Sequence, residues 1–392
     1  MALQPAAGVR DLNPGEVARN RRLCERLAEV YRLWGYQEVD PPVIERQDTL
    51  AAGGAIATRD VVRLASDEPL GLRPELTASI ARAAGTRLAD QPRPLRLWAC
   101  GATFRASLGD TGSQRISEAL QSGVELLGEA GPAADSELLH LLLDATASLG
   151  LLPQHQPTLL IGHHGLLDAL VAGVPNPQRQ AARKALTGFD PLALAALDLS
   201  GEQRRRLEAL MGLRGDPEAV LSSLRLWLGP VPLLENLDST LAAVATAAAR
   251  HGVRLQMDPT FQPHFDLYDG LVLRLVCQGS DAPVAIASGG RYDALVARFS
   301  PEPAQAAGTG FGFDIGAIRE LLGAGESQDV IDAPWLVAAA SADGIGAALA
   351  RMVELHHQGQ AAELCSQPTP SQAAADDLAR DRGCRGAIWL AG

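Results

Sequence analysis

Side chains that can bind a charged ligand recur at every second position in one short segment of the chain. Arg73, Glu75 and Thr77 are each two residues apart, and the apolar Leu72 and Leu76 occupy alternate positions. In a β-strand, such alternation places polar and apolar side chains on opposite faces of the sheet. We therefore expect one polar face that carries a guanidinium, a carboxylate and a hydroxyl group.

A second segment, residues 95–125, shows the same alternation on the two strands of a predicted hairpin. The first strand places Thr103 and Arg105 on one face, and the return strand places Gln121 and Glu125 together. A buried carboxylate is stable only when another group pairs with it, so polar side chains that share a sheet face usually form the floor of a pocket. A solvated sheet face is the alternative interpretation for either segment taken alone.

These segments resemble motifs of a known enzyme class. The strand that ends at Arg105, its loop and the run 121–125 (Gln-x-Gly-x-Glu) are similar to motif 2 of class II aminoacyl-tRNA synthetases. The run 72–77 (Leu-Arg-Pro-Glu-x-Thr) narrows the resemblance to histidyl-tRNA synthetase. The resemblance implies an α+β fold in which an antiparallel sheet is flanked by helices.

The segment before these motifs predicts a helix followed by a strand. Asn13 caps the helix, with Pro14 in the first turn and Glu16 three residues after the cap. An apolar stripe at helical spacing continues to Gly35, which ends the helix. The next strand bends at two prolines within residues 35–45, and the helix and strand together resemble motif 1. The resemblance implies a homodimer, because motif 1 forms the dimer interface in that class.

The chain beyond the hairpin is predicted to alternate helices with turns. A hairpin is expected at residues 61–73, and helices are expected at residues 75–89 and 133–149. Further on, a strand turns into a helix at His163 and His164. Because adjacent histidines point in different directions, we expect turn residues there and no metal site.

The rest of the chain is predicted to hold a helical insertion, more sheet and a small domain. The insertion covers about residues 166–250 within a synthetase-like core of residues 1–325. Sheet patterns return at the segments 254–258, 265–277 and 284–288, and a turn is expected at 289–293. A glycine-rich strand at 308–316 enters a helix at Ala317 and is similar to motif 3. Residues 333–392 read as a βαβαβ unit, a truncated α/β counterpart of the synthetase's anticodon-binding domain.

Composition and charge narrow the class of protein. With 392 residues, 47% hydrophobic and 20% charged, the chain is expected to be globular and to hold two or three domains. A net charge of −12 argues against a nucleic-acid partner, which requires a basic surface. The longest apolar segment, about residues 138–152, is too short and too polar to cross a membrane, and we see no secretory signal. The five scattered cysteines lack a C-x-x-C pair, which predicts reduced thiols in the cytoplasm and no zinc site.

The resemblance assigns a histidine-binding site to both polar segments. Histidyl-tRNA synthetases bind the amino group of histidine with groups that correspond to Glu75, Thr77 and Gln121. They bind the imidazole ring with groups that correspond to Glu125 and Tyr268. A histidine ligand needs acceptors for its ammonium group and partners for both ring nitrogens, so the set is complete.

The groups that would activate histidine with ATP are missing by the same comparison. The arginine that contacts the substrate carboxylate and the α-phosphate corresponds to Pro263, and the motif 3 arginine corresponds to Ala317. An acidic residue of motif 2 corresponds to Ser107, and Arg319 would point elsewhere on its helix. Loss of one preorganised donor typically lowers a rate roughly a hundred- to a thousandfold, so we expect no adenylation.

A chain that keeps the histidine-binding groups without the catalytic ones resembles the regulatory subunits of ATP phosphoribosyltransferase, which are paralogues of histidyl-tRNA synthetase. The Gly-His-x-Gly turn at 162–165 supports this resemblance, because true synthetases usually have Asn-Ser there. It implies a non-catalytic subunit, with no cofactor or metal, in a hetero-oligomer with a short catalytic subunit. That glycosyltransferase complex joins ATP to phosphoribosyl pyrophosphate in the first step of histidine biosynthesis. L-histidine would be the allosteric feedback effector, with Arg105 or Arg115 binding its carboxylate.

Two other classes stay open at this point. A divergent but active histidyl-tRNA synthetase would need another arginine at the α-phosphate and would show ATP–pyrophosphate exchange. A tRNA-binding synthetase-like module would need a basic surface near its C-terminus, which the acidic balance disfavours. The feedback site could also lie at the interface between subunits.

Overall fold

The chain forms two compact units, Met1–Leu321 and Leu322–Gly392. The computed structural model describes residues 4–52, 58–108, 114–262, 267–300, 302, 306–323 and 333–391. Within those residues, no helix combines the length and the apolar character needed to cross a membrane.

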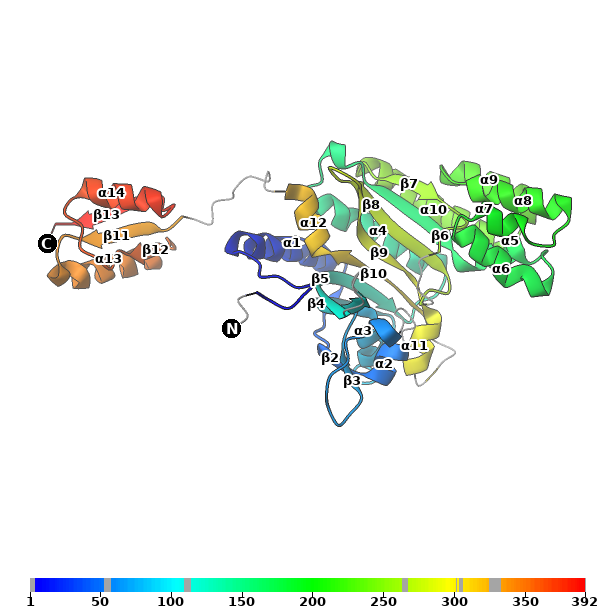
Figure 1. Ribbon diagram of the computed structural model, residues 1–392, viewed down its shortest axis with the longest axis horizontal. Coiled ribbons are helices and arrows are strands. Elements are labelled where there is room, and N and C mark those ends of the chain that lie inside the picture. Colours follow the sequence, from blue (N-terminus) through cyan, green and yellow to red (C-terminus); the bar gives the residue numbers. More distant parts are fainter. Residues whose placement is uncertain are drawn as a thin grey trace. The chain divides into compact units, whose positions relative to one another are not determined.

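The larger unit is built on an eight-stranded sheet (Figure 1). Its strands, in spatial order, are β1 (Gln37–Glu38), β4 (Leu95–Leu108), β5 (Gln114–Leu127), β10 (Gly308–Asp314), β9 (Pro283–Arg291), β8 (Leu271–Gln278), β6 (Thr158–His163) and β7 (Arg254–Met257). The strands from β4 to β6 are antiparallel, which confirms the predicted sheet, and the edge strands β1 and β7 are parallel to their neighbours. The pairing of β5 with β10 joins the motif 2 and motif 3 segments directly.

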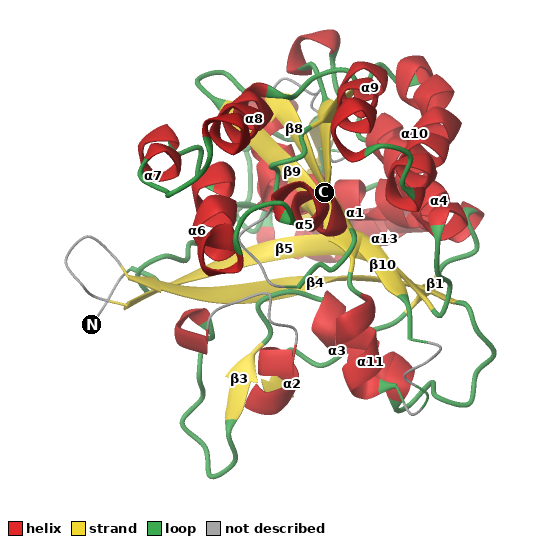
Figure 2. Cartoon of the chain, turned by 90° about the vertical axis from the view of Figure 1, so that its right-hand side faces the viewer, coloured by secondary structure: helices red, strands yellow, loops and turns green. Residues whose placement is uncertain are grey.

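Helices cover both faces of this sheet. Those of the larger unit are α1 (Pro14–Leu33), α2 (Gln47–Ala52), α3 (Thr77–Gly85), α4 (Pro132–Ser148), α5 (His164–Val171), α6 (Asn176–Thr187), α7 (Pro191–Ala195), α8 (Gly201–Gly212), α9 (Pro217–Leu228), α10 (Pro232–Arg250), α11 (Asp293–Phe299) and α12 (Ile315–Leu322). Figure 2 shows α2, α3 and α11 on one side of the long β4–β5 hairpin, and α1 and α4 on the other. The segment from α5 to α10 is helical, as predicted for residues 166–250.

Aromatic packing fixes α1 against its face of the sheet. The predicted capping box is present, because Asn13 and Glu16 each accept a hydrogen bond from the other's backbone N–H group. Tyr31 then contacts Trp98 of β4 and Phe311 of β10, with ring centroids 5.8 Å and 6.4 Å away. This face is therefore an apolar core, and the polar side chains of the same strands lie on the opposite face.

The smaller unit is the predicted βαβαβ arrangement. Its parallel sheet has the order β12 (Ala362–Leu364), β11 (Trp335–Ala339) and β13 (Gly386–Leu390), and its helices are α13 (Ile345–His357) and α14 (Gln372–Asp381). Apolar clusters on both sides of β11, around Leu336 and Val337, give this unit a core of its own.

Two local predictions, the strand through residues 73–77 and the turn at 289–293, are wrong. Residues 73–77 do not continue a strand, because β3 (Leu70–Leu72) ends before Pro74, which lacks the N–H group that a strand ladder needs. The hairpin at 61–73 is confirmed as a short antiparallel pairing, with a bridge from Arg63 to Gly71 and backbone hydrogen bonds from Leu64 N–H to Leu70 and from Leu72 N–H to Val62. The other edge of β3 pairs with β2 (Ile44–Arg46). The turn expected at 289–293 starts too early, because β9 runs through Arg291 before α11 begins.

Candidate functional site

Strand register places the two polar side chains of β5 over the glycine-rich strand β10. Gly310 lies opposite Glu125, and Asp314 lies opposite Gln121. Since side chains alternate along both strands, these four positions share one face, the face opposite α1. The strands thus bring motif 2 and motif 3 residues together without any further loop.

Glu125 is the buried centre of this face. Its side chain is 3% exposed, Thr77 donates a hydrogen bond from Oγ1 to Oε1 at 2.6 Å, and the Tyr292 hydroxyl donates to Oε2. Burial raises the pKa of Glu125 to about 8, against the lowering effect of both hydrogen bonds. At neutral pH, this carboxyl therefore mostly keeps its proton.

A second carboxyl, that of Glu75, stands at the start of α3. It accepts a hydrogen bond from the Ala78 backbone N–H at 3.0 Å and another from the Thr77 backbone N–H. The pKa of Glu75 is raised by burial, although these N–H groups lower it. Gln121 completes the group, because its Oε1 accepts from the Leu76 N–H at 3.2 Å. The first turn of α3 is thus tied to β5.

Glycines leave room for the long polar side chains to lie across neighbouring strands. A Cβ atom on Gly310 would stand 1.7 Å from Oε2 of Glu125, and one on Gly312 would stand 2.3 Å from Nε2 of Gln121. On β9, a Cβ atom at Gly290 would be 2.8 Å from Cδ1 of Tyr268. We call Gly290, Gly310 and Gly312 the glycine floor. Any side chain at these positions would displace a site residue.

A cavity of about 470 Å³ adjoins this group, beyond Gln121. Its polar lining comes from five strands and comprises Thr103, Arg105, Ser117, Gln121, Arg274, Ser288 and Asp314. Two guanidinium groups therefore face the space next to the proposed amino-acid site. Burial raises the pKa of Tyr268, and the charges of Arg274 and Arg105 act in the opposite direction.

The structure brings most of the predicted site residues close together. Glu75, Thr77, Gln121 and Glu125 are linked by hydrogen bonds directly or through α3, and the charges of Glu75 and Glu125 each affect Tyr268. Arg105 lines the adjoining cavity and donates from Nε to the carbonyl of Pro74 at 3.4 Å.

Arg115 and Arg73 lie away from this group. Arg115 is exposed near the tip of the hairpin, six residues from Gln121, which corresponds to about 20 Å along a strand. Arg73 is buried and donates to the carbonyl of Ala102 at 2.9 Å, where it holds the chain before α3 against β4. The expectation that Arg73 shares a polar face with Glu75 and Thr77 is wrong because the chain leaves the sheet at Leu72.

Sequence reasoning missed Arg274 and Tyr292. Arg274 is the charged residue of the otherwise apolar strand Leu271–Cys277, and this contrast was the available signal. Tyr292 follows β9 directly, and no pattern in the sequence distinguishes its hydroxyl from that of a core tyrosine.

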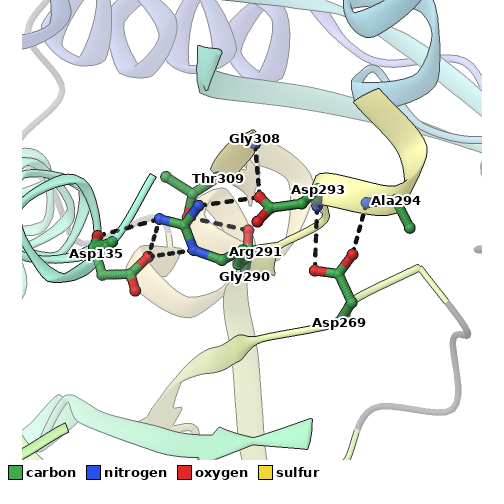
Figure 3. A network of polar contacts seen from close by, with 9 residues as sticks. Asp135, Asp269, Gly290, Arg291, Asp293, Ala294, Gly308 and Thr309 are labelled. Atoms are coloured by element: carbon green, nitrogen blue, oxygen red, sulfur yellow. Dashed lines mark hydrogen bonds and ion pairs between the residues drawn. The ribbon is translucent and has the colours of Figure 1, made fainter. Parts of the chain in front are cut away.

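A polar network around Arg291 involves the segments next to both tyrosines, and Figure 3 shows its members Asp135, Arg291, Asp293 and Asp269. The buried Arg291 donates from Nη2 to Asp135 Oδ1 at 2.8 Å and from Nη1 to Asp293 Oδ1 at 3.0 Å. Asp269 accepts from the N–H groups of Asp293 and Ala294 at 3.1 Å and 2.6 Å. Tyr292 lies between Arg291 and Asp293 in sequence, and Tyr268 precedes Asp269. The network therefore holds the segments that carry the two phenols.

Three of the positions compared with ATP-binding groups of the synthetases, Arg319, Ser107 and Ala317, lie in the described residues. Arg319 is 7% exposed and donates to Asn20 Oδ1 of α1 at 2.9 Å, so it turns away from the cavity as expected. Ser107 is exposed on β4, and Ala317 lies in the first turn of α12, where its N–H donates to Asp314. Pro263 lies outside the described residues.

The histidine turn has a structural role. Nδ1 of His163 accepts from the Gly165 N–H at 3.0 Å and caps α5, and burial lowers the pKa of His163 to about 4. In the described part of the chain, no group of three or more His, Cys, Asp or Glu side chains could hold a metal ion.

Comparison with known proteins defines the class first. Residues 8–318 match the family model described as histidyl-tRNA synthetase. A solved histidyl-tRNA synthetase from Nostoc sp. PCC 7120 shares the fold, with a TM-score of 0.78 at 16% identity over 100% of this chain and 92% of that one. The chain is therefore a class II protein with the histidyl-tRNA synthetase fold.

Full-length relatives then define the family. Proteins named ATP phosphoribosyltransferase regulatory subunit from Synechococcus sp. (strain RCC307) and Prochlorococcus marinus (strain MIT 9303) are each 51% identical to this chain, over 100% of both chains. A Bacillus halodurans C structure, described as an ATP phosphoribosyltransferase regulatory subunit/histidyl-tRNA synthetase, has a TM-score of 0.84 at 25% identity, covering 100% of this chain and 99% of that one. The chain belongs to the family of ATP phosphoribosyltransferase regulatory subunits.

Proposed function

We propose that this chain supports a short catalytic ATP phosphoribosyltransferase subunit in the first step of histidine biosynthesis and carries feedback inhibition by L-histidine. Full-length identity of 51% to regulatory subunits of that enzyme is the observation that carries the proposal. The chain itself transfers no group, and the glycosyl transfer takes place on the partner. Its five cysteines are free thiols, which suits a cytoplasmic location.

The geometry around Glu125 suits an imidazole ligand. Imidazole presents one donor and one acceptor nitrogen when it is neutral. A Glu125 carboxyl with a pKa of about 8 keeps its proton at pH 7 and can donate it to an acceptor nitrogen, and the Tyr268 phenol lies nearby. Glu75 and Gln121 supply oxygen acceptors for the ligand's ammonium group.

Inhibition needs no chemistry in this site. If histidine binds one conformation of the complex more tightly than another, it shifts the equilibrium between them, and allosteric coupling of this kind typically amounts to about 1–3 kcal/mol. Thr77 at the start of α3 bonds directly to Glu125 of β5, so an occupied site can change how α3 packs on the sheet. Movement of α3 is the simplest route for the signal to leave the site.

A homodimer is part of the same proposal. A groove of about 780 Å³ runs between α1 and β4, and Leu33, at the end of α1, is 86% exposed. Ile44 of β2 is 50% exposed in the same motif 1 segment. Exposed large apolar side chains are typical of an interaction surface, and Leu33 and Ile44 belong to the motif that forms the dimer in class II synthetases.

Reconstitution with the catalytic subunit tests the function. We expect pyrophosphate release from ATP and phosphoribosyl pyrophosphate to require this chain, and L-histidine to inhibit it. The isolated chain should show no histidine-dependent ATP–pyrophosphate exchange. Catalysis that is independent of this chain would refute the supporting role, and exchange activity would identify an active synthetase instead.

A further inference from the structure

Arg274 is a cation on the floor of the cavity without an assigned role. It belongs to β8 and lies in the lateral row that runs through Ser288 and Gly312 to Gly123 of β5. Its guanidinium stacks on the ring of Phe261, 5.5 Å from the centroid. Within the described ranges, no carboxylate forms an ion pair with it. A half-buried guanidinium of this kind is ready to bind an anion.

The space between Arg274 and β5 is large enough to hold an amino acid. Three strand spacings separate Arg274 from Gly123, about 14 Å between Cα atoms. The intervening positions Ser288 and Gly312 are small, and the cavity of about 470 Å³ opens above them. Gln121 borders this cavity from β5 and Arg274 borders it from β8, so both side chains line the same space.

Charge in the cavity favours an oxyanion near Arg274. Arg105 lines the same cavity, but it is exposed and donates to the backbone of Pro74. Asp314, at the opposite edge, accepts from the Ala317 N–H and caps α12. Arginine binds a carboxylate through two parallel hydrogen bonds, which adds geometric specificity to the charge interaction.

We propose that Arg274 binds the carboxylate of the histidine ligand, whose imidazole lies at Glu125. This inference rests on the proposed histidine site and names the group that replaces the arginine missing at Pro263. It makes Arg274 the residue by which the site distinguishes an amino acid from the corresponding amine or alcohol. Inorganic phosphate shares the chemistry of an oxyanion and is the other ligand to be tested.

Calorimetric titration of the full-length chain tests the assignment with two ligands. L-histidinol keeps the imidazole and the amino group but carries a hydroxymethyl group in place of the carboxylate. Arg274→Met should weaken L-histidine binding roughly 10- to 100-fold, the usual effect of losing a hydrogen-bonded charge, and should leave L-histidinol binding within about twofold. Arg274→Lys should give an intermediate loss, because it keeps the charge without the paired donors.

The controls separate the alternatives. Arg254→Met, on the edge strand β7, should change neither affinity, and thermal unfolding should show that all variants fold. Equal weakening of both ligands would reduce Arg274 to a structural residue, and an unchanged L-histidine affinity would also overturn the assignment. A selective loss with Arg105→Met but not with Arg274→Met would move the role to Arg105. Phosphate binding that is lost in Arg274→Met, with L-histidine binding intact, would make the cavity a phosphate site. If the unmodified chain and its complex with the catalytic subunit bind no L-histidine, the proposed histidine site itself fails.

Discussion

At the scale of single residues, the proton on Glu125 has a measurable consequence for stability. Burial raises its pKa from 4.5 to about 8, so between these values the folded chain binds more protons than the unfolded chain. The free energy of unfolding that Glu125 contributes is complete below about pH 4.5 and falls as the pH rises toward 8. The loss amounts to about 1.4 kcal/mol for each pH unit in the steepest range.

Glu125→Gln should remove this dependence, because glutamine keeps the shape without titrating. We expect the melting temperature of the wild type to fall, relative to that of the variant, between pH 5 and pH 8. Thermal unfolding followed by circular dichroism at several pH values measures the difference. Glu118→Gln, an exposed position on the same strand, is the matched control. Parallel curves for wild type and Glu125→Gln would show that Glu125 does not hold its proton.

Single site residues were predicted correctly from the sequence where polar and apolar side chains alternate along one strand. Alternation along β5 placed Gln121 and Glu125 together, and the structure has them on one face. Alternation failed for Arg73, because the chain had already left the sheet and its side chain bonds to backbone carbonyls. Arg274 was not predicted as a site residue, because the residues that line the same cavity belong to strands far away in sequence. Only the order of the strands in the sheet shows that they lie together.

At the scale of elements, the glycines of β10 leave the space in which the Glu125 side chain lies. Gly310→Ala would place a methyl group 1.7 Å from the Glu125 carboxyl, so the carboxyl must move off Thr77 and Tyr292. We expect L-histidine binding to be lost and the chain to be destabilised by roughly 1–3 kcal/mol, as in other overpacked cores.

A matched control separates this effect from the cost of any glycine replacement. Gly212→Ala, at the end of α8, adds the same methyl group where no atom lies within 4 Å. Calorimetric titration and urea unfolding should show no loss there. Wild-type histidine affinity in Gly310→Ala would mean that the ligand does not depend on the position of Glu125.

Elements with strong local signals were predicted well. The capping box of α1 and the separate strands of the βαβαβ unit are confirmed, because caps and short apolar strands depend on neighbouring residues. The end of β9 was misplaced because Gly289 and Gly290 read as a turn. In the sheet they are the positions over which β10 and Tyr268 approach the backbone closely.

At the scale of the whole molecule, the proposed homodimer predicts two different outcomes for equally exposed leucines. Leu33 in the motif 1 segment and Leu226 on α9 are both 86% exposed. Leu33→Glu should bury a charge at the dimer interface and shift the chain toward monomers, and Leu226→Glu should not. Sedimentation velocity measures the distribution directly. A wild-type monomer, or a dimer unaffected by Leu33→Glu, would contradict this interface.

The order of the motifs predicted the class II sheet, whereas other parts of the architecture required the structure. The sequence indicates a helical insertion from its composition, but the packing of α10 on α4 depends on contacts between segments about a hundred residues apart. The edge strands β1 and β7 pair in parallel with β4 and β6, respectively. Such pairing leaves no local pattern in the sequence, so it could not be predicted.

The glycine floor also has a consequence for genetics. A bacterium that must make its own histidine and is selected on a toxic histidine analogue has to lose feedback inhibition while keeping a folded, supporting subunit. Changes at Gly290, Gly310 or Gly312 would damage the fold together with the site, so they would not survive that selection. If the proposed histidine site is correct, resistant variants should instead cluster at residues proposed to border the ligand, such as Thr77, Gln121 and Arg274. The backbone thus confines resistance mutations to a few side chains.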